Sequence, residues 1–257
     1  INMSMINGQI SRGTNILDLV IPPQLEESIL TGVKWFDDAL GGYGLTPSQV
    51  CLFTGTPGAG KTTTMLQIAD AWTKSGNICL LNTVEEALVQ VRKVTKRLGL
   101  TSGFICGQDR LVPAALEHFD QLRAANPNKK ALIILDSLQV HDDGKYKDGG
   151  TNSMTPVRIA EMVSEYCKAT YAMTIMIGQV TKGGKFAGKQ QLQHNIDSHA
   201  HVYIDQRPTS ETYGKRIFKF EKNRFGPANM GSILNMTGDG GLIAESPFEG
   251  DDDDAAE

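Results

Sequence analysis

The sequence has no apolar stretch approaching the ~18–20 residues needed to cross a bilayer, and its first residues lack the charged-then-apolar pattern of a secretory signal. It also has only four cysteines, none of them in a CxxC pair: Cys51, Cys79, Cys106 and Cys167. Cys51 and Cys79 lie in strand-like apolar runs, which favours buried thiols over disulfides or a zinc site. These absences argue against a membrane protein and a disulfide-stapled domain, and we expect a cytoplasmic location.

Charge is distributed unevenly along the chain. The net charge of the 257 residues is −4, but residues 245–257 hold seven acids and no base. The rest of the chain is therefore mildly basic, and we expect residues 245–257 to be a disordered acidic tail. Two roles stay open for this tail: a solubilising segment, or a mobile polyanion that competes with a polyanionic partner for a basic surface.

The remaining composition, 40% apolar and 21% charged, is that of a soluble globular protein with a substantial core. Residues 1–30 show no sustained periodicity and contain Pro22-Pro23. We interpret them as an N-terminal arm or linker, with packing on a neighbouring subunit as one option. Residues 31–244 are the predicted core domain, and the sequence contains no internal repeat.

Strand and helix patterns alternate along this core. Strands are predicted at residues 50–54, 78–83, 131–136, 173–178 and 201–205. Helices are predicted at residues 33–40, 63–74, 85–98, 112–125 and 157–171, the last capped by Thr155 with Pro156 at its first position. Two further strands, at 216–221 and 231–236, form a β-hairpin. The pattern predicts an α/β fold: a mainly parallel central sheet flanked by helices, with a C-terminal antiparallel β-hairpin.

A complete GxxxxGK[ST] phosphate loop lies between the strand at 50–54 and the helix at 63–74. Its glycines let consecutive backbone N–H groups face an anion, and the positive end of the helix dipole reinforces them. Lys61 is predicted to reach the β- and γ-phosphates of ATP, and the Thr62 hydroxyl to hold Mg²⁺. The predicted ATP-binding residues are Gly55, Thr56, Pro57, Gly58, Ala59, Gly60, Lys61, Thr62 and Thr63.

Two acidic positions complete the predicted catalytic centre. Asp136 ends the apolar strand at 131–136, in the form of a Walker B element, where a carboxylate can hold Mg²⁺ through water. Hydrolysis also needs a group that orients or deprotonates the attacking water. Glu85 and Glu86 both follow the strand at 78–83, and we prefer Glu85 because it lies nearer the strand end. Helix capping is an additional role for either acid.

Gln179 closes the strand at 173–178 and is predicted to hydrogen-bond the γ-phosphate and report its loss to the loop that follows. That loop mixes cations, glycines and one aromatic residue, as expected of a mobile segment that binds a nucleic-acid backbone. Its predicted DNA contacts are Lys182, Lys185, Phe186 and Lys189. A second long loop, 141–155, has lysines but also acids, and it is a weaker candidate.

The turn after the strand at 216–221 reads Lys222-Asn223-Arg224-Phe225-Gly226. Two cations on a projecting turn, far from the phosphate loop in sequence, suggest a finger that completes a neighbour's active site. His194, His199 and His201 do not match a metal site, because their spacing fits no helix face with a carboxylate partner.

Taken together, these motifs resemble the RecA-type core of the bacterial RadA (Sms) family. The resemblance runs from about Thr31 to Leu242, and it includes Thr31-Gly32-Val33, Leu40-Gly41-Gly42, Asp136-Ser137-Leu138-Gln139 and Val180-Thr181-Lys182 beside the motifs above. Its most specific mark is the Lys222 to Gly226 turn. The family implies a RecA-fold ATPase that forms hexameric rings on single-stranded DNA, a DnaB-like motor for branch migration of recombination intermediates. The resemblance also implies Lys222 and Arg224 as a pair acting in trans.

The sequence departs from the family pattern in several places. We expect neither the four-cysteine zinc module nor the Lon-protease-like carboxyl-terminal domain of full-length members. Gln179 stands where the family more often has histidine, and Ala59 where it has a bulkier residue. A compact version from a phage or another mobile element, or a divergent short relative, would explain this, and a bacterial or phage-infected cell is the expected source. The acidic tail is similar to the one that restrains DNA binding in RecA.

Three functions follow. The first is a DNA-dependent ATPase, a ring-forming motor of helicase or branch-migration type on single-stranded DNA. The second is a filament-forming strand-exchange recombinase of RecA type, whose relatives usually carry an additional DNA-binding or polymerisation segment not evident here. The third is a nucleotide-switched regulatory protein resembling the KaiC family. Glu85 together with the Lys222/Arg224 finger favours turnover over switching.

Overall fold

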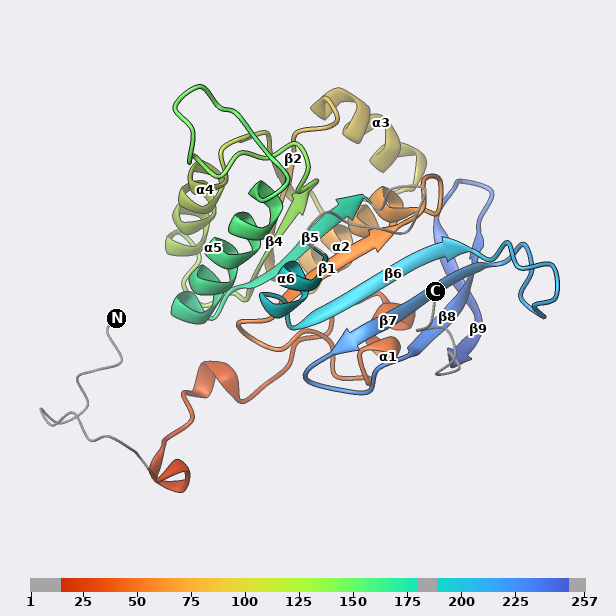
Figure 1. The fold of residues 1–257 in the computed structure, drawn as a ribbon, viewed down its shortest axis with the longest axis horizontal. Coiled ribbons are helices and arrows are strands. Elements are labelled where there is room, and N and C mark those ends of the chain that lie inside the picture. The colour runs from red at the N-terminus through yellow and green to blue at the C-terminus, as the bar shows by residue number, and fades with distance from the viewer. Residues whose placement is uncertain (1–14, 180–188, 250–257) are drawn as a thin grey trace, which may run out of the picture.

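A computed structural model of the chain describes residues 15–179 and 189–249, which fold around a nine-stranded sheet (Figure 1). The sheet has the spatial order β3-β2-β4-β5-β1-β6-β7-β8-β9. The strands are β1 (Val50–Gly55), β2 (Ile78–Thr83), β3 (Ile105–Gly107), β4 (Ala131–Asp136), β5 (Met173–Gln179), β6 (Ser198–Ile204), β7 (Arg216–Asn223), β8 (Met230–Met236) and β9 (Leu242–Glu249). The helices are α1 (Lys34–Ala39), α2 (Lys61–Lys74), α3 (Leu88–Arg97), α4 (Val112–Ala124), α5 (Thr155–Thr170) and α6 (Lys189–His194).

The first six strands run parallel and the last three pairings are antiparallel. The predicted fold class is therefore confirmed. Because β1, β2, β4 and β5 are parallel, their carboxyl ends meet at one edge of the sheet, and the loops that follow them share one side of the molecule. All of the predicted catalytic positions except the finger lie at or just after the ends of these four strands.

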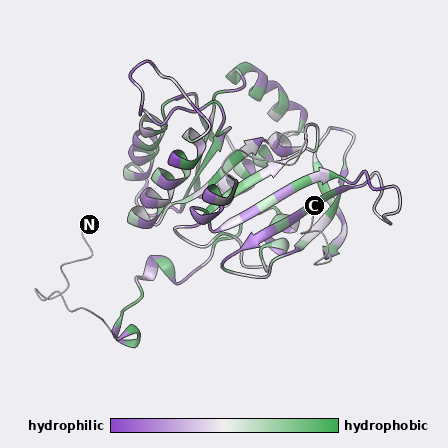
Figure 2. Ribbon diagram, in the orientation of Figure 1, coloured by the Kyte–Doolittle hydropathy of each residue, from purple (hydrophilic) through white to green (hydrophobic). Residues whose placement is uncertain are grey.

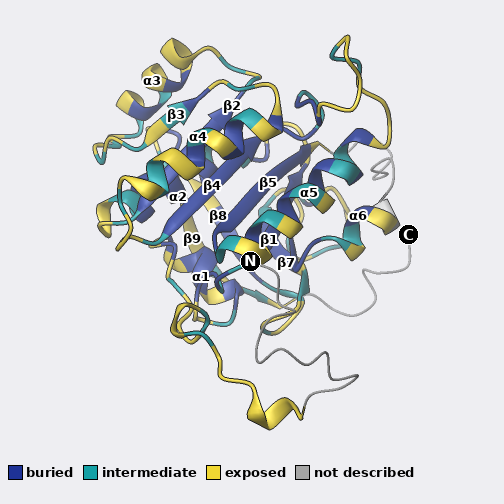
Figure 3. Ribbon diagram, turned by 90° about the vertical axis from the view of Figure 1, so that its left-hand side faces the viewer, coloured by how far each residue is buried: buried dark blue, intermediate teal, exposed yellow. Residues whose placement is uncertain are grey.

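Strand β4 shows why the central strands read as continuous apolar runs. Leu132 and Ile134 belong to a core on one face of the sheet, whereas Ile133 and Leu135 belong to a second core on the other face. A strand covered on both faces has no polar side to alternate with. Figure 2 shows the apolar central strands, and Figure 3 shows their burial between helices with exposed outer faces.

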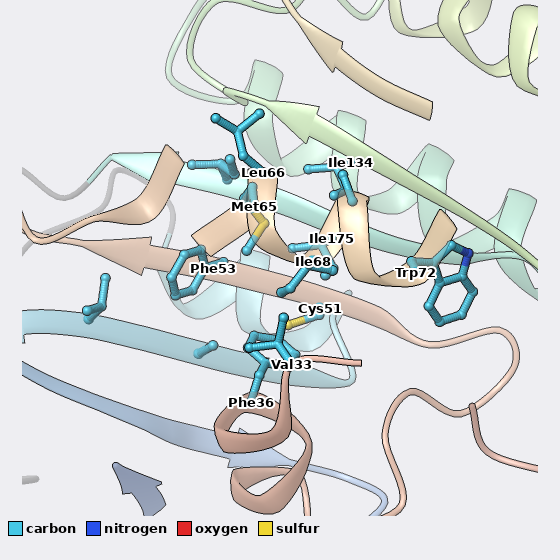
Figure 4. Close-up of a cluster of buried hydrophobic side chains, with 14 of the residues drawn as sticks. Val33, Phe36, Cys51, Phe53, Met65, Leu66, Ile68, Trp72, Ile134 and Ile175 are labelled. Carbon is cyan, nitrogen blue, oxygen red and sulfur yellow. The ribbon is translucent and has the colours of Figure 1, made fainter. Parts of the chain in front are cut away.

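The first core holds α2 and α1 against the sheet (Figure 4). Met65, Ile68 and Trp72 recur at helical spacing on α2 and are at most 1% exposed. Phe36 on α1 packs against Phe218 of β7, with ring centroids 5.3 Å apart. Aromatic contacts of this kind fix α1 on the antiparallel strands that extend the sheet beyond β1.

The antiparallel region is larger than the predicted hairpin. Residues 242–249 form β9, which pairs along β8, so the segment 245–249 is an edge strand rather than part of a disordered tail. The sequence did not reveal it because an edge strand with one open side lacks an apolar alternation and here contains Pro247. The rest of the predicted tail lies outside the described residues.

Other boundaries also differ from the predictions. β6 begins at Ser198 rather than His201, and α5 begins at Thr155 itself with Met154 as its N-cap. The short strand β3 and helix α6 were not predicted, because a three-residue strand and a six-residue helix are too short to show a period.

Residues 15–28 lead away from the sheet as an arm with two short 3₁₀ turns, η1 (Ile16–Asp18) and η2 (Pro23–Leu25) (Figure 3). Leu17 and Val20 in this arm are 87% and 89% exposed. The arm joins the body at Ile29, which forms an isolated bridge with Leu45. No helix in the described ranges is both long enough and apolar enough to cross a membrane.

Candidate nucleotide site and hairpin finger

The phosphate loop connects β1 to α2, as its sequence requires. Gly58 and Gly60 have positive φ angles of 77° and 103°, a conformation that side chains other than glycine rarely adopt. Gly55 has no room for a side chain, since a Cβ there would lie 2.4 Å from the Val202 carbonyl oxygen. The three glycines therefore shape the loop so that backbone N–H groups and the start of α2 can face an anion.

Lys61, the first residue of α2, folds back over this loop. Its Nζ donates to the carbonyl oxygens of Gly55, at 2.7 Å, and Thr56, at 3.3 Å. Burial lowers the pKa of the ammonium, while the negative charges of Asp136 and Glu85 act in the opposite direction. Lys61 thus interacts electrostatically with both predicted acids. Its ammonium lies where phosphate oxygens could replace the loop carbonyls as its hydrogen-bond acceptors.

Asp136 ends β4 beside the phosphate loop and is only 5% exposed. Burial, together with the nearby charges of Glu85 and Glu86, raises its pKa to about 7, against the hydrogen bond from Thr83 and the charge of Lys61. A buried carboxyl with this excess of negative charge fits a divalent cation, which would stabilise its ionised form. The described residues contain no group of three or more metal-binding side chains. The donor set fits Mg²⁺ held mainly by phosphates, with the Thr62 hydroxyl and Asp136.

We predict that Asp136→Asn stabilises the protein without nucleotide. The folded carboxyl keeps its proton up to about pH 7, whereas an unfolded aspartate loses it near pH 3.8. Folding is therefore coupled to proton uptake between these values, and the free energy of unfolding falls as pH rises through this window. Asp136→Asn should raise the free energy of unfolding by roughly 1–3 kcal/mol at pH 8 and by less at pH 5.

Urea unfolding at pH 5 and pH 8 measures this difference. Asp38→Asn is the matched control, because Asp38 is an exposed carboxylate paired with Lys34 on α1. Equal effects of the two substitutions at both pH values would contradict the proposed burial of negative charge at Asp136.

Glu85 is the centre of a hydrogen-bond cluster that the sequence only partly indicates. Its Oε1 accepts from Ser137 Oγ and from Gln179 Nε2, both at 2.6 Å. The side chain of Gln139 makes two hydrogen bonds with the backbone of Gln179. Its Oε1 accepts from the Gln179 N–H at 3.2 Å, and its Nε2 donates to the Gln179 carbonyl at 3.4 Å. The fold therefore brings Glu85 and Gln179 together across 94 positions of sequence. Ser137 and Gln139 were seen in the Walker B motif but had no predicted role.

Two buried side chains, His141 and Asn82, contact this cluster through the backbone of Ser137. The carbonyl of Ser137 lies 2.7 Å from His141 Nδ1, and His141 Nε2 lies 2.9 Å from Asn82 Nδ2. Since the carbonyl can only accept and the amide nitrogen can only donate, the proton of His141 resides on Nδ1. Burial lowers the pKa of His141, which keeps the ring neutral. Neither residue has a sequence signal, because a single buried histidine and a strand asparagine resemble many structural residues.

Arg216 is a further residue that the sequence did not single out. It begins β7, and its Nη2 lies 3.5 Å from the carbonyl oxygen of Gly58 in the phosphate loop. Its Nε is buried and has no hydrogen-bond partner among the described residues. Burial lowers the pKa of this guanidinium. Arg216 therefore adds a positive charge at the outer side of the phosphate loop.

The predicted finger lies at the other end of the sheet. Asn223 pairs with Ser198, which pairs with Cys51 at the start of β1, whereas the phosphate loop follows Gly55 at its end. Four residues of parallel strand separate these levels by about 13 Å. Lys222 Nζ donates to the carbonyl oxygens of Gln193 and Ile196, and Arg224 Nη1 donates to Asp197 Oδ1 at 2.9 Å. Neither cation contacts the phosphate loop of its own chain.

Three of the predicted DNA contacts, Lys182, Lys185 and Phe186, lie outside the described residues. Lys189 is the first residue of α6, and its side chain is likewise not described. In the loop at 141–155, Asp143 pairs with Arg158 of the adjoining helix α5, so part of the loop's acidic charge is compensated. His199 and His201 both approach the hydroxyl of Thr54.

Comparison with known proteins agrees with this geometry. A family model described as "ATPase: KaiC" matches residues 29–112, which include the phosphate loop and Glu85. Among solved structures, one described as an ATPase domain superimposes with a TM-score of 0.72 over 85% of this chain and 93% of that one, at 15% sequence identity. The fold and the site define a P-loop ATPase of the RecA class.

Relatives described as DNA repair protein RadA place the chain within this class. The protein from Mycolicibacterium smegmatis is 33% identical over 216 residues, covering 81% of this chain and 43% of its own length. Those from Aquifex aeolicus and Haemophilus influenzae are 32% and 33% identical, covering 82% and 84% of this chain and 45% of their own lengths. The chain belongs to the RadA-type RecA-fold ATPases and spans less than half the length of these relatives.

Proposed function

We propose that the protein is an ATP-dependent DNA motor in recombination or repair, which hydrolyses ATP between subunits of a ring-like oligomer on single-stranded DNA. One observation carries the proposal. Lys61, Glu85 and Asp136 converge at the end of β1, while Lys222 and Arg224 lie at the opposite end of the same strand. A complete site then needs the finger of a neighbouring subunit, which is the arrangement expected of a shared ATPase site.

In this mechanism the phosphate loop and Lys61 hold the phosphates of ATP. Thr62 and Asp136, the latter through water, would hold Mg²⁺, which would supply positive charge to the phosphates of ATP. Glu85 orients the attacking water and accepts its proton, and Ser137 holds the Glu85 carboxylate through their hydrogen bond at 2.6 Å. Lys222 and Arg224 of the neighbour stabilise the charge that develops on the transferred group.

Gln179 is the proposed link between hydrolysis and DNA. Its side-chain amide donates to Glu85 Oε1 at 2.6 Å, so the carboxylate that would orient the water also accepts from this glutamine. A γ-phosphate in the site would offer Gln179 a second acceptor. Its backbone leads directly into the segment with Lys182, Lys185 and Phe186, so a change at Gln179 would be passed to the proposed DNA contacts.

The ATPase rate of the purified protein tests this function. We expect strong stimulation by single-stranded DNA at low salt, and a rate that rises more steeply than linearly with protein concentration, because a shared site exists only in an oligomer. Raising the salt concentration should reduce the stimulation, since phosphate contacts release counterions. A slow rate that is indifferent to DNA and to protein concentration would contradict the motor.

Two alternatives remain. A RecA-type recombinase would form filaments and exchange strands between homologous DNAs, and a strand-exchange assay separates it from the motor. A KaiC-like nucleotide switch is favoured by the family model that matches residues 29–112. That match includes the phosphate loop and Glu85 and ends before Asp136 and the finger. Slow turnover that does not depend on DNA is the result that would support the switch. We propose that the protein acts in the cytoplasm of a bacterial or phage-infected cell.

A further inference from the structure

A row of polar side chains crosses the sheet between the phosphate loop and the finger, on the face opposite the first core. Thr54, which precedes the first glycine of the phosphate loop, places its hydroxyl 2.7 Å from His199 Nε2 and 2.8 Å from His201 Nδ1. The other ring nitrogen of His199, Nδ1, is buried without a hydrogen bond of good geometry among the described residues, and Glu221 Oε2 lies 3.1 Å from it, at the distance of an ion pair. Glu221 directly precedes Lys222 in the chain, so the row joins the base of the phosphate loop to the finger.

The row is buried where it meets the loop. Thr54 is 2% and His199 5% exposed. A hydroxyl has one proton and two lone pairs, so Thr54 donates either to one imidazole or to the Ala200 carbonyl oxygen at 3.5 Å, and it accepts from any ring to which it does not donate. The orientation of both rings is therefore tied to Thr54, and a small displacement of this residue changes the hydrogen bonds of both histidines.

A β-bulge directs Glu221 into this row. In the pairing of β6 with β7, His199 is opposite Lys222 and Ala200 is opposite Phe220, which leaves Glu221 as the extra residue. Bulges of this kind redirect a side chain and commonly lie next to functional sites. Without the extra residue, Glu221 and the finger that follows it would stand in a different register relative to His199.

Charge holds the carboxylate end of the row. Burial acts to raise the pKa of Glu221, but its side-chain contact with His199 and the charges of His199, His201 and Lys219 bring it down to about 2. Glu221 is therefore ionised at any working pH and can pair with His199. Thr54 is too enclosed to act as a nucleophile, so the row is not a hydrolytic triad despite its hydroxyl, imidazole and carboxylate.

We propose that Thr54, His199 and Glu221 are positioning residues that couple the phosphate loop of each subunit to its own finger, and through the finger to the site of the neighbour. This proposal rests on the proposed function, because it assigns Arg224 to the neighbouring active site. Movement of β1 on nucleotide binding is transmitted along the row to the bulge. The finger is then placed according to the state of the subunit that carries it.

Mixed oligomers test the proposal. Lys61→Ala subunits keep an intact finger, and Arg224→Ala subunits keep an intact phosphate loop. Their mixture should therefore recover ATPase activity above that of either variant alone. The recovered sites are those in which a Lys61→Ala subunit supplies the finger to the phosphate loop of an Arg224→Ala subunit. Adding Glu221→Gln to the Lys61→Ala partner, which donates the finger, should lower the recovered turnover roughly 10-fold with little change in KM for ATP. Adding it to the Arg224→Ala partner should have little effect.

Two controls keep the outcome specific. Glu245→Gln on the donor removes an exposed carboxylate that pairs with Lys215 at 2.9 Å, outside the row, and should leave the recovery unchanged. In otherwise unmodified protein, Thr54→Val should lower turnover, Thr54→Ser should restore it, and Thr54→Val with Glu221→Gln should be no worse than the more severe single substitution. Thermal unfolding checks that each variant is folded.

The outcomes separate the two proposals. Failure of the Lys61→Ala and Arg224→Ala mixture to recover any activity would contradict the shared site itself. Recovery that is lowered equally by Glu221→Gln on either partner, or on neither, would contradict only the positioning row. Additive losses in the Thr54 and Glu221 double variant would likewise show that the two residues act independently.

Discussion

Replacing Lys61 with alanine should abolish ATP hydrolysis, lowering turnover by at least about 10³-fold. The phosphate loop supplies partial positive charge from backbone N–H groups, whereas Lys61 carries a full positive charge that contacts the loop carbonyls of Gly55 and Thr56. Lys61 interacts electrostatically with both Asp136 and Glu85. Without Lys61, the negative charge that develops between the β- and γ-phosphates lies near these two carboxylates and lacks the cation that offsets them. Nucleotide affinity should fall as well, because the lysine binds the ground state and the transition state.

Turnover and nucleotide affinity should be measured on the same preparation, with Lys74→Ala as the control. Lys74 lies at the far end of the same helix, where it pairs with Asp70 at 2.6 Å and cannot reach the loop. Lys74→Ala should hydrolyse ATP at nearly the normal rate. Normal turnover in Lys61→Ala would show that the loop does not bind the phosphates as we infer.

Replacing Arg224 with alanine should cut turnover by roughly 10³-fold while leaving nucleotide affinity nearly unchanged. The separation of the two effects follows from the register of the sheet. Arg224 follows the end of β7 that pairs with the start of β6, at the level where β1 begins, and its guanidinium contacts Asp197. It therefore contributes nothing to ATP bound in its own subunit. In the proposed shared site, its loss would remove charge stabilisation only from the transition state in the neighbouring subunit.

Equilibrium binding of a fluorescent ATP analogue, beside the steady-state rate, distinguishes this result from misfolding. Lys215→Ala is the control, since Lys215 is a cation of the same antiparallel region whose partner is the exposed Glu245. Parallel losses of affinity and turnover in Arg224→Ala would indicate a structural role for the Arg224–Asp197 pair. Loss of turnover alone supports the finger.

The agreement between sequence and structure is best where one local rule decides the outcome. The strands β2 and β4 begin and end where predicted, because apolar runs bounded by turn residues define strands covered on both faces. The phosphate loop follows from glycine conformation and helix polarity, which are properties of eight consecutive residues. The assignment to an ATPase of RecA fold and the resemblance to the RadA family were likewise available from motifs alone, and the comparisons confirm them.

Prediction failed where structure depends on partners distant in sequence. The segment 245–249 reads as an acidic tail, yet it forms part of β9 because β8 supplies a hydrogen-bonding edge. Arg216 belongs to no sequence motif, and it lies near Gly58 only because β7 pairs with β6 in the sheet. His141 and Asn82 support Ser137 from behind, a relation that appears only when β2 and β4 lie side by side.

The sequence by itself therefore indicated a nucleotide-binding ATPase, through a phosphate loop, two glutamates after one strand and an aspartate that ends another. It also determined the family, through the turn that contains Lys222 and Arg224. Only the tertiary structure decided how these parts are divided. The parallel register of β1 with β6 and the bulge at Glu221 set the finger at one end of the sheet and the phosphate loop at the other. The reason is physical: each residue of a strand adds a fixed rise, so two groups at opposite ends of one sheet cannot meet within a single chain.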